Sequence, residues 1–205
     1  MKKLALALGC LFVTGCASYV TPLCDDTNRR DLPNFEGAFT TVLTQVDKTG
    51  SHTERYEFEI SRVARGEYLV EHHDGATHAN LCEIASHYYL ENNQSWITGI
   101  PVKGYLAFQV SANGDNSFDL TALGLDSKVL ADQGIKFDLV ENHTKKDAPD
   151  DKDFSSILAY NAGVPAEQFV QILEPQSFKL TLRPGGNRLA KAALAHIHGK
   201  SSKFN

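Results

Sequence analysis

Apolar and polar side chains alternate with a period of two residues along most of this chain. In the stretch RYEFEISRV, Tyr56, Phe58 and Ile60 share one face, while Arg55 and Glu57 lie on the other. This period is typical of a β-strand with one buried and one solvated face. It recurs at Tyr68 and Val70, at Cys82, Ile84, Tyr88 and Leu90, at Leu106, Phe108 and Val110, at Phe118 and Leu120, at Ile135, Phe137 and Leu139, and at Phe178, Leu180 and Leu182. The chain is therefore predicted to be mainly β, with Cys82 on an inward face.

Short polar segments rich in turn-forming residues separate these strands. They are Lys48-Thr49-Gly50, His73-Asp74-Gly75, Glu91-Asn92-Asn93 and Asn113-Gly114-Asp115-Asn116. Tight turns between alternating segments indicate hairpins. We expect seven to nine strands in an antiparallel meander over residues 35–186, closed as a barrel or stacked as a sandwich.

A few short helices are expected in the C-terminal third. Asp126 can cap a short helix that ends at Gly134, and Pro165 can begin another that Pro175 stops. Acidic residues at its start predict a third helix over Asp150–Asn161. Asn187 can cap a last helix over 188–198 that ends at Gly199.

The first residues have the pattern of an export signal. Lys2 and Lys3 precede an apolar run that is too short to span a bilayer, which needs roughly 20 residues. The run ends in Val13-Thr14-Gly15-Cys16, which resembles the lipobox of bacterial lipoproteins. The resemblance implies that residues 1–15 are removed and that Cys16 becomes a lipid-modified N-terminus. Several acyl chains anchor a protein stably to a membrane.

The lipoprotein resemblance also implies a location. In the proteobacterial sorting rule, Asp after the lipidated Cys retains the protein in the inner membrane, and this chain has Ala17 there. We therefore expect the periplasmic face of the outer membrane. Polar residues 16–34, which include Pro22 and Pro33, are expected to form a lipidated tether.

Two cysteines remain once Cys10 is removed with the signal and Cys16 is acylated. Cys24 and Cys82 would then share an oxidising compartment, where two cysteines most simply form a disulfide. The alternative is a pair of free thiols, with Cys82 buried as a small apolar side chain.

Charge is distributed unevenly. All 25 acidic residues precede residue 175, and the Lys and Arg residues are the only charged residues after it. The tail 187–205 carries Arg188, Lys191, Lys200 and Lys203. This basic helix or tail is expected to dock on the acidic body, to stay in solvent or to bind an anionic envelope component.

Histidines supply the only concentrated group of reactive side chains. His72, His73 and His78 flank one expected hairpin turn, and opposing side chains in a hairpin lie about 5 Å apart. They form a candidate zinc or copper site. The alternative is that a polar turn simply contains histidines.

The segment FEGAF, residues 35–39, resembles the Gly-x-aromatic start of the first lipocalin strand. A meander with a late helix fits that family, although Phe39 stands where a Trp is expected and Trp96 lies far away. The resemblance implies a barrel that carries a hydrophobic ligand and assigns no binding residue.

No known catalytic motif is found. The sequence has no Gly-x-Ser-x-Gly, no His-Glu-x-x-His, no Walker loop and no dinucleotide-binding fingerprint. We therefore expect a non-enzymatic envelope binding or interaction module with no cofactor and no nucleic-acid partner. Two alternatives stay open: a lipocalin-like carrier of a small hydrophobic ligand or lipid, and an envelope hydrolase with dispersed catalytic residues.

Overall fold

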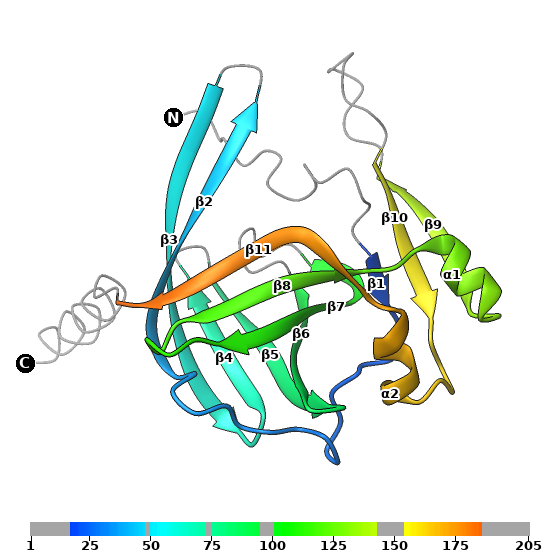
Figure 1. Cartoon of the computed structure of the whole chain (residues 1–205), viewed down its shortest axis with the longest axis horizontal. Coiled ribbons are helices and arrows are strands. Elements are labelled where there is room, and N and C mark those ends of the chain that lie inside the picture. Colours follow the sequence, from blue (N-terminus) through cyan, green and yellow to red (C-terminus); the bar gives the residue numbers. More distant parts are fainter. Residues whose placement is uncertain (1–16, 48–49, 73–74, 95–100, 143–153, 186–205) are drawn as a thin grey trace, which may run out of the picture.

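An antiparallel barrel of eight strands forms the body of the molecule (Figure 1). The computed structural model describes residues 17–47, 50–72, 75–94, 101–142 and 154–185. The barrel strands are β2 (Gly37–Asp47), β3 (Gly50–Ala64), β4 (Glu67–His72), β5 (Gly75–Ile84), β6 (His87–Gln94), β7 (Pro101–Ala112), β8 (Phe118–Gly124) and β11 (Glu174–Pro184). Pairing of β6 with β7 and of β11 with β2 closes the ring. The sequence left barrel and sandwich open, and the structure is a barrel.

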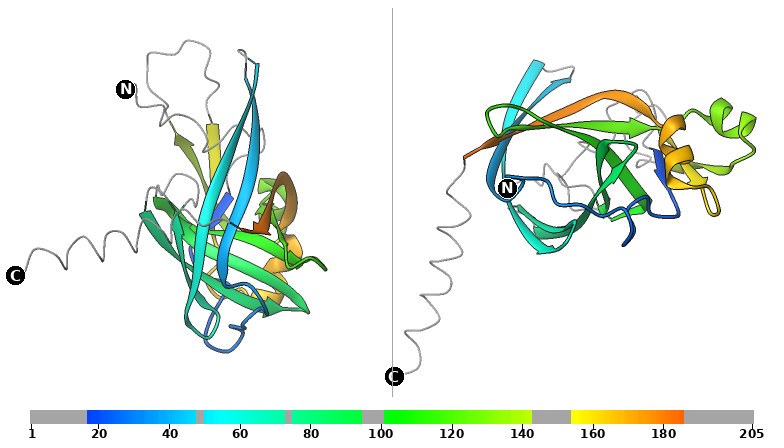
Figure 2. Two further views of the ribbon diagram at one scale, coloured as in Figure 1. Left: turned by 90° about the vertical axis from the view of Figure 1, so that its left-hand side faces the viewer. Right: turned by 60° about the horizontal axis from the view of Figure 1, so that its bottom comes forward.

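An insertion between β8 and β11 lies to one side of the barrel (Figure 2). It contains α1 (Ser127–Asp132), β9 (Lys136–Asn142), β10 (Phe154–Tyr160), α2 (Ala166–Phe169) and the 3₁₀ turn η1 (Val170–Ile172). The short strand β1 (Ala17–Tyr19) joins it to the barrel, because β1 pairs in parallel with β10 and Tyr19 pairs with Tyr105 of β7. Within the described residues, no helix has the length and apolar character needed to cross a membrane.

Two separate hydrophobic cores follow from the alternation of the strands. One fills the barrel and includes Phe39, Phe58 and Leu120. The other lies on the outer face of β5 to β8, where the insertion and the N-terminal residues cover Tyr89 and Ala107. Covering one outer face explains why several strands are apolar on both sides.

The expected helices have mixed outcomes. Asp126 caps α1 by accepting a hydrogen bond from the Lys128 amide, and Pro165 precedes α2, as predicted. The helix predicted over Asp150–Asn161 is wrong in its described part, because residues 154–160 form β10. This strand pairs with β1 on one edge and β9 on the other, so sheet partners from distant sequence override the local helical pattern.

The sequence predicts a tether over residues 16–34, but residues 17–36 pack against the barrel. We call residues 17–36 the N-terminal strap. Tyr19, Leu23 and Leu32 are buried, and Phe35 is fully buried inside the barrel. The strap passes beneath the barrel before it enters β2 (Figure 1). It is therefore part of the folded domain.

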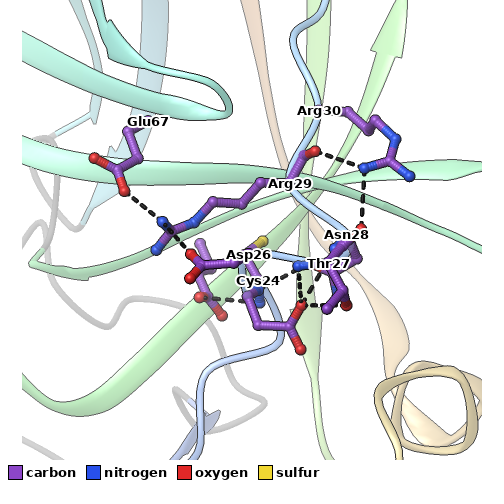
Figure 3. A network of polar contacts seen from close by, with 9 residues as sticks. Cys24, Asp26, Thr27, Asn28, Arg29, Arg30 and Glu67 are labelled. Carbon is purple, nitrogen blue, oxygen red and sulfur yellow. Dashed lines mark hydrogen bonds and ion pairs between the residues drawn. The ribbon is translucent and has the colours of Figure 1, made fainter.

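Polar contacts fix the middle of the strap (Figure 3). The Arg29 guanidinium bridges Asp26 of the strap and Glu67 of β4. The backbone also joins the sheet: the Arg30 amide donates to the Leu81 carbonyl at 3.1 Å, and the Glu83 amide donates to the Asn28 carbonyl at 3.0 Å. The strap thus pairs with the edge of β5 beyond Glu67, the residue at which β4 begins.

The predicted disulfide between Cys24 and Cys82 is present. It joins the strap to β5. Cys82 does not face the barrel interior as predicted, because Leu81 occupies that face and Cys82 belongs to the outer core. The strap buries it completely from outside, which is why periodicity alone assigned the wrong face.

Several predictions fall on residues that the structure does not describe. They are the signal residues 1–15, the lipid-modified Cys16, His73, and the basic tail with its helix over 188–198 and its residues Arg188, Lys191, Lys200 and Lys203.

Candidate ligand-binding site in the barrel

One end of the barrel is plugged by aromatic side chains. Phe35 of the strap contacts Tyr68 and Phe118 edge to face, with ring centroids 5.3 Å and 5.0 Å apart, and Phe39 packs against the same cluster. The Leu32 amide lies 3.4 Å from the Tyr68 hydroxyl. This end is apolar and filled.

The inward face becomes polar toward the other end. Thr41, His72, Thr77 and Asn92 are all buried, and each alternates with barrel-core residues on its strand. They come from β2, β4, β5 and β6. We call these four residues the polar ring.

Two members of the polar ring have unsatisfied side chains. Thr41 and Asn92 are only 2% and 3% exposed. Within the described part of the chain, neither Thr41 Oγ1 nor Asn92 Nδ2 and Oδ1 has a hydrogen-bond partner. Buried polar atoms are nearly always paired with protein, water or ligand, so these three atoms mark a place that accepts polar partners.

The two residues lie on opposite walls. Eight strands form the ring, and β2 and β6 are four strands apart in either direction. Inward side chains at Thr41 and Asn92 therefore face each other across the interior. An eight-stranded barrel is just wide enough to be filled by side chains or to hold one small ligand.

Charge is scarce on the inward face near the polar ring. Glu54 of β3 shares the face of Tyr56, accepts a hydrogen bond from its hydroxyl at 2.6 Å and is exposed at the rim. Among the inward side chains that the structure describes at this end, none is a lysine or an arginine. The site offers hydrogen bonds without a fixed positive charge.

On the outer face of the same strand, Glu91 fastens the strap. Its carboxylate is fully buried. Oε2 accepts hydrogen bonds from the Leu23 amide at 2.7 Å and the Tyr19 hydroxyl at 3.1 Å, and Oε1 accepts one from the Cys24 amide at 3.2 Å. Neighbouring residues of β6 thus hold the strap outside and line the interior.

Burial dominates the electrostatics of Glu91. Desolvation raises the pKa of this carboxyl to about 7, against the opposing effect of its hydrogen bonds. Burial and the nearby Glu91 carboxylate raise the pKa of Tyr19 well above its usual value. Tyr19 therefore remains a neutral donor at physiological pH.

The predicted histidine site is not assembled by the two histidines that the structure describes. Leu69 pairs with His78 and Val70 pairs with Thr77, so His72 shares the inward face of Val70 while His78 is exposed on the outer face. Side chains on opposite faces of a sheet cannot bind one metal ion. No group of three or more His, Cys, Asp or Glu side chains suited to a metal is found among the described residues.

Sequence reasoning missed the positions of Glu91 and Asn92 in β6. Glu91-Asn92-Asn93 looked like a turn, yet all three continue the strand. The available signal was the alternation itself: Tyr88 and Leu90 predict that residue 92 faces inward. Asparagine and glutamate are depleted in strands, so their presence here indicates a specific use.

Comparison with known proteins gives no match: no protein-family model, no curated protein and no solved structure is significantly similar to this chain.

Proposed function

We propose that this protein is a non-enzymatic binding module of the bacterial envelope, anchored to the outer membrane through Cys16, and that its barrel binds a small ligand at the polar ring. The observation that carries the proposal is the unpaired, buried polar atoms of Thr41 and Asn92 on opposite walls. Such atoms are costly in a core that serves only to hold a fold together.

The shape of the barrel supports the same function. The plug at Phe35 closes one end, and the strap, the disulfide and Glu91 fix the wall that carries Asn92. A rigid wall keeps binding groups in place before the ligand arrives, which reduces the ordering cost of binding.

Native mass spectrometry tests the proposal. Residues 17–205 would be exported to the periplasm and analysed before and after denaturation without reductant. A native excess mass that is lost on unfolding supports ligand binding. The neutral fluorophore N-phenyl-1-naphthylamine provides a second measurement. Saturable binding is expected, and the bulky substitution Asn92→Trp should abolish it by filling the interior.

The outcome against the proposal is a bare polypeptide mass together with no saturable uptake of the fluorophore. Binding would then have to occur on the outer surface, as in a protein–protein interaction module.

A further inference from the structure

Resting on the proposed function, we infer that the ligand is an uncharged amphiphile whose head group carries both a hydrogen-bond donor and an acceptor, as an amide or a glycerol ester does. The juxtaposition behind it is an unpaired carboxamide on β6 facing an unpaired hydroxyl on β2.

Asn92 sets the hydrogen-bonding pattern. Its Nδ2 group donates and its Oδ1 atom accepts, and neither has a partner within the described residues. A head group that only accepts leaves Oδ1 unpaired, and one that only donates leaves Nδ2 unpaired. The coplanar N–H and C=O groups of an amide can form hydrogen bonds with Oδ1 and Nδ2 at the same time.

Thr41 extends this pattern to the opposite wall. A hydroxyl can donate and accept, and Thr41 Oγ1 is as deeply buried as the Asn92 side chain. A head group between the two walls can therefore bond to both. A purely apolar ligand would leave all three atoms unpaired.

Charge argues against ionic head groups. Asn92 is 3% exposed, and no inward lysine or arginine is described at this end to neutralise an anion. The imidazole of His72 in the polar ring carries a positive charge only when it is protonated. The one acidic group described there, Glu54, is at the exposed rim. A buried charge without a close partner is strongly disfavoured, so a neutral head group fits best.

Apolar side chains flank the polar ring and suit the remainder of an amphiphile. Leu43 follows Thr41 on the inward face of β2, and Leu106 is paired with Asn92 across β6 and β7. Phe178 of β11 packs against the barrel core nearby and is only partly buried. The head group lies between Thr41 and Asn92, and the hydrocarbon contacts these three residues.

Three probes of equal chain length test the inference: dodecanamide, dodecanoate and dodecylammonium. Each would compete with N-phenyl-1-naphthylamine for the folded protein without Cys16. Dodecanamide is expected to compete at roughly tenfold lower concentration than either ion, the change that about 1.4 kcal/mol of differential hydrogen bonding produces.

Variants separate selectivity for the amide head group from nonspecific hydrophobic binding. In Asn92→Leu the preference for the amide should be lost, and in Thr41→Val it should be reduced. Thr121→Val is the matched control, because Thr121 faces outward between inward residues of β8, and it should leave the preference unchanged. Should Asn92→Leu fail to fold, Thr41→Val decides alone.

The outcomes distinguish the two proposals. Equal competition by all three probes, or a preference that persists in both inward variants, overturns the neutral-amphiphile inference while the binding function stands. Failure of every probe and of the fluorophore to bind overturns the proposed function, and this inference with it.

Discussion

At the scale of single residues, Glu91 controls how stability depends on pH. Its folded pKa of about 7 lies above the usual value of 4.5, so the folded state binds a proton that the unfolded chain releases. Stability from this group is complete below pH 4.5 and is lost as the pH rises through 7. The loss amounts to roughly 3 kcal/mol.

Glu91→Gln is expected to remove this pH dependence. Glutamine has nearly the same shape and does not titrate, but its NH2 group cannot accept a hydrogen bond, whereas both oxygens of the protonated carboxyl can accept from the donors of Tyr19, Leu23 and Cys24. The variant should be less stable at pH 5 by about 1–3 kcal/mol, with a flatter profile toward pH 8. Urea denaturation between pH 5 and pH 8 measures both effects, and parallel profiles for the two proteins would contradict the assignment.

Single residues are also where sequence reasoning is weakest. The disulfide partners could be inferred, because the predicted removal of Cys10 and acylation of Cys16 leave only Cys24 and Cys82, which are bonded in the structure. The roles of Glu91 and Asn92 could not, because they depend on what packs against each face of β6. One face of β6 lines the barrel interior and the strap covers the other, so neither face is exposed to solvent. The sequence pattern of β6 alone cannot show that the strap covers its outer face.

At the scale of elements, alternation identified most barrel strands because each has one face in a single continuous core. The pattern failed at β10, whose identity depends on strands β1 and β9 from elsewhere in the chain. The expected tether failed for a related reason. Polar residues in the strap form hydrogen bonds with one another; Asp25, for example, accepts hydrogen bonds from the Thr27 and Asn28 amides. A few apolar residues between them fill the end of the barrel and the outer core.

Docking of β1 on β7 depends on Gly104. Its φ is +83°, and a Cβ there would lie 2.5 Å from the Tyr19 carbonyl oxygen. Gly104→Ala should therefore cost about 2–4 kcal/mol, from backbone strain and a clash that moves β1 away. Denaturation measures the loss, and hydrogen exchange should show reduced protection of residues 17–19.

Two other glycines serve as matched controls for Gly104. Gly134 has a φ of +68° with open space around it, so Gly134→Ala reports strain alone. Gly114 has neither strain nor a close neighbour, and Gly114→Ala should be nearly silent. If all three variants lose the same stability, the contact with Tyr19 is not what requires glycine at position 104.

At the scale of the whole molecule, the Cys24–Cys82 disulfide ties the strap to the barrel across 58 residues of sequence. In the chain-entropy account, closing a loop of this length stabilises the fold by about 4 kcal/mol. The double variant Cys24→Ser/Cys82→Ser should lose stability of this order, as judged by urea denaturation beside the oxidised protein. It should also be cut faster by proteases within the strap, and a loss below about 1 kcal/mol would show that Glu91 and the plug hold the strap unaided.

The lipid anchor proposed at Cys16 would decide where in the envelope the barrel lies. β1 begins at Ala17, so no spacer separates the predicted lipid-bearing Cys16 from the folded domain, and the barrel should stay at the membrane surface. Replacing residues 1–16 with a signal peptide that is cleaved without lipidation should release the protein into the soluble periplasmic fraction of a Gram-negative host, because several acyl chains are needed for stable anchoring. Ala17→Asp keeps the acylation site and should shift the protein from outer to inner membranes on a sucrose gradient. Sedimentation of this unlipidated protein with membranes would mean that another surface of the protein binds the bilayer. A soluble unlipidated protein together with an unshifted Ala17→Asp would leave the anchor in place and remove the sorting prediction.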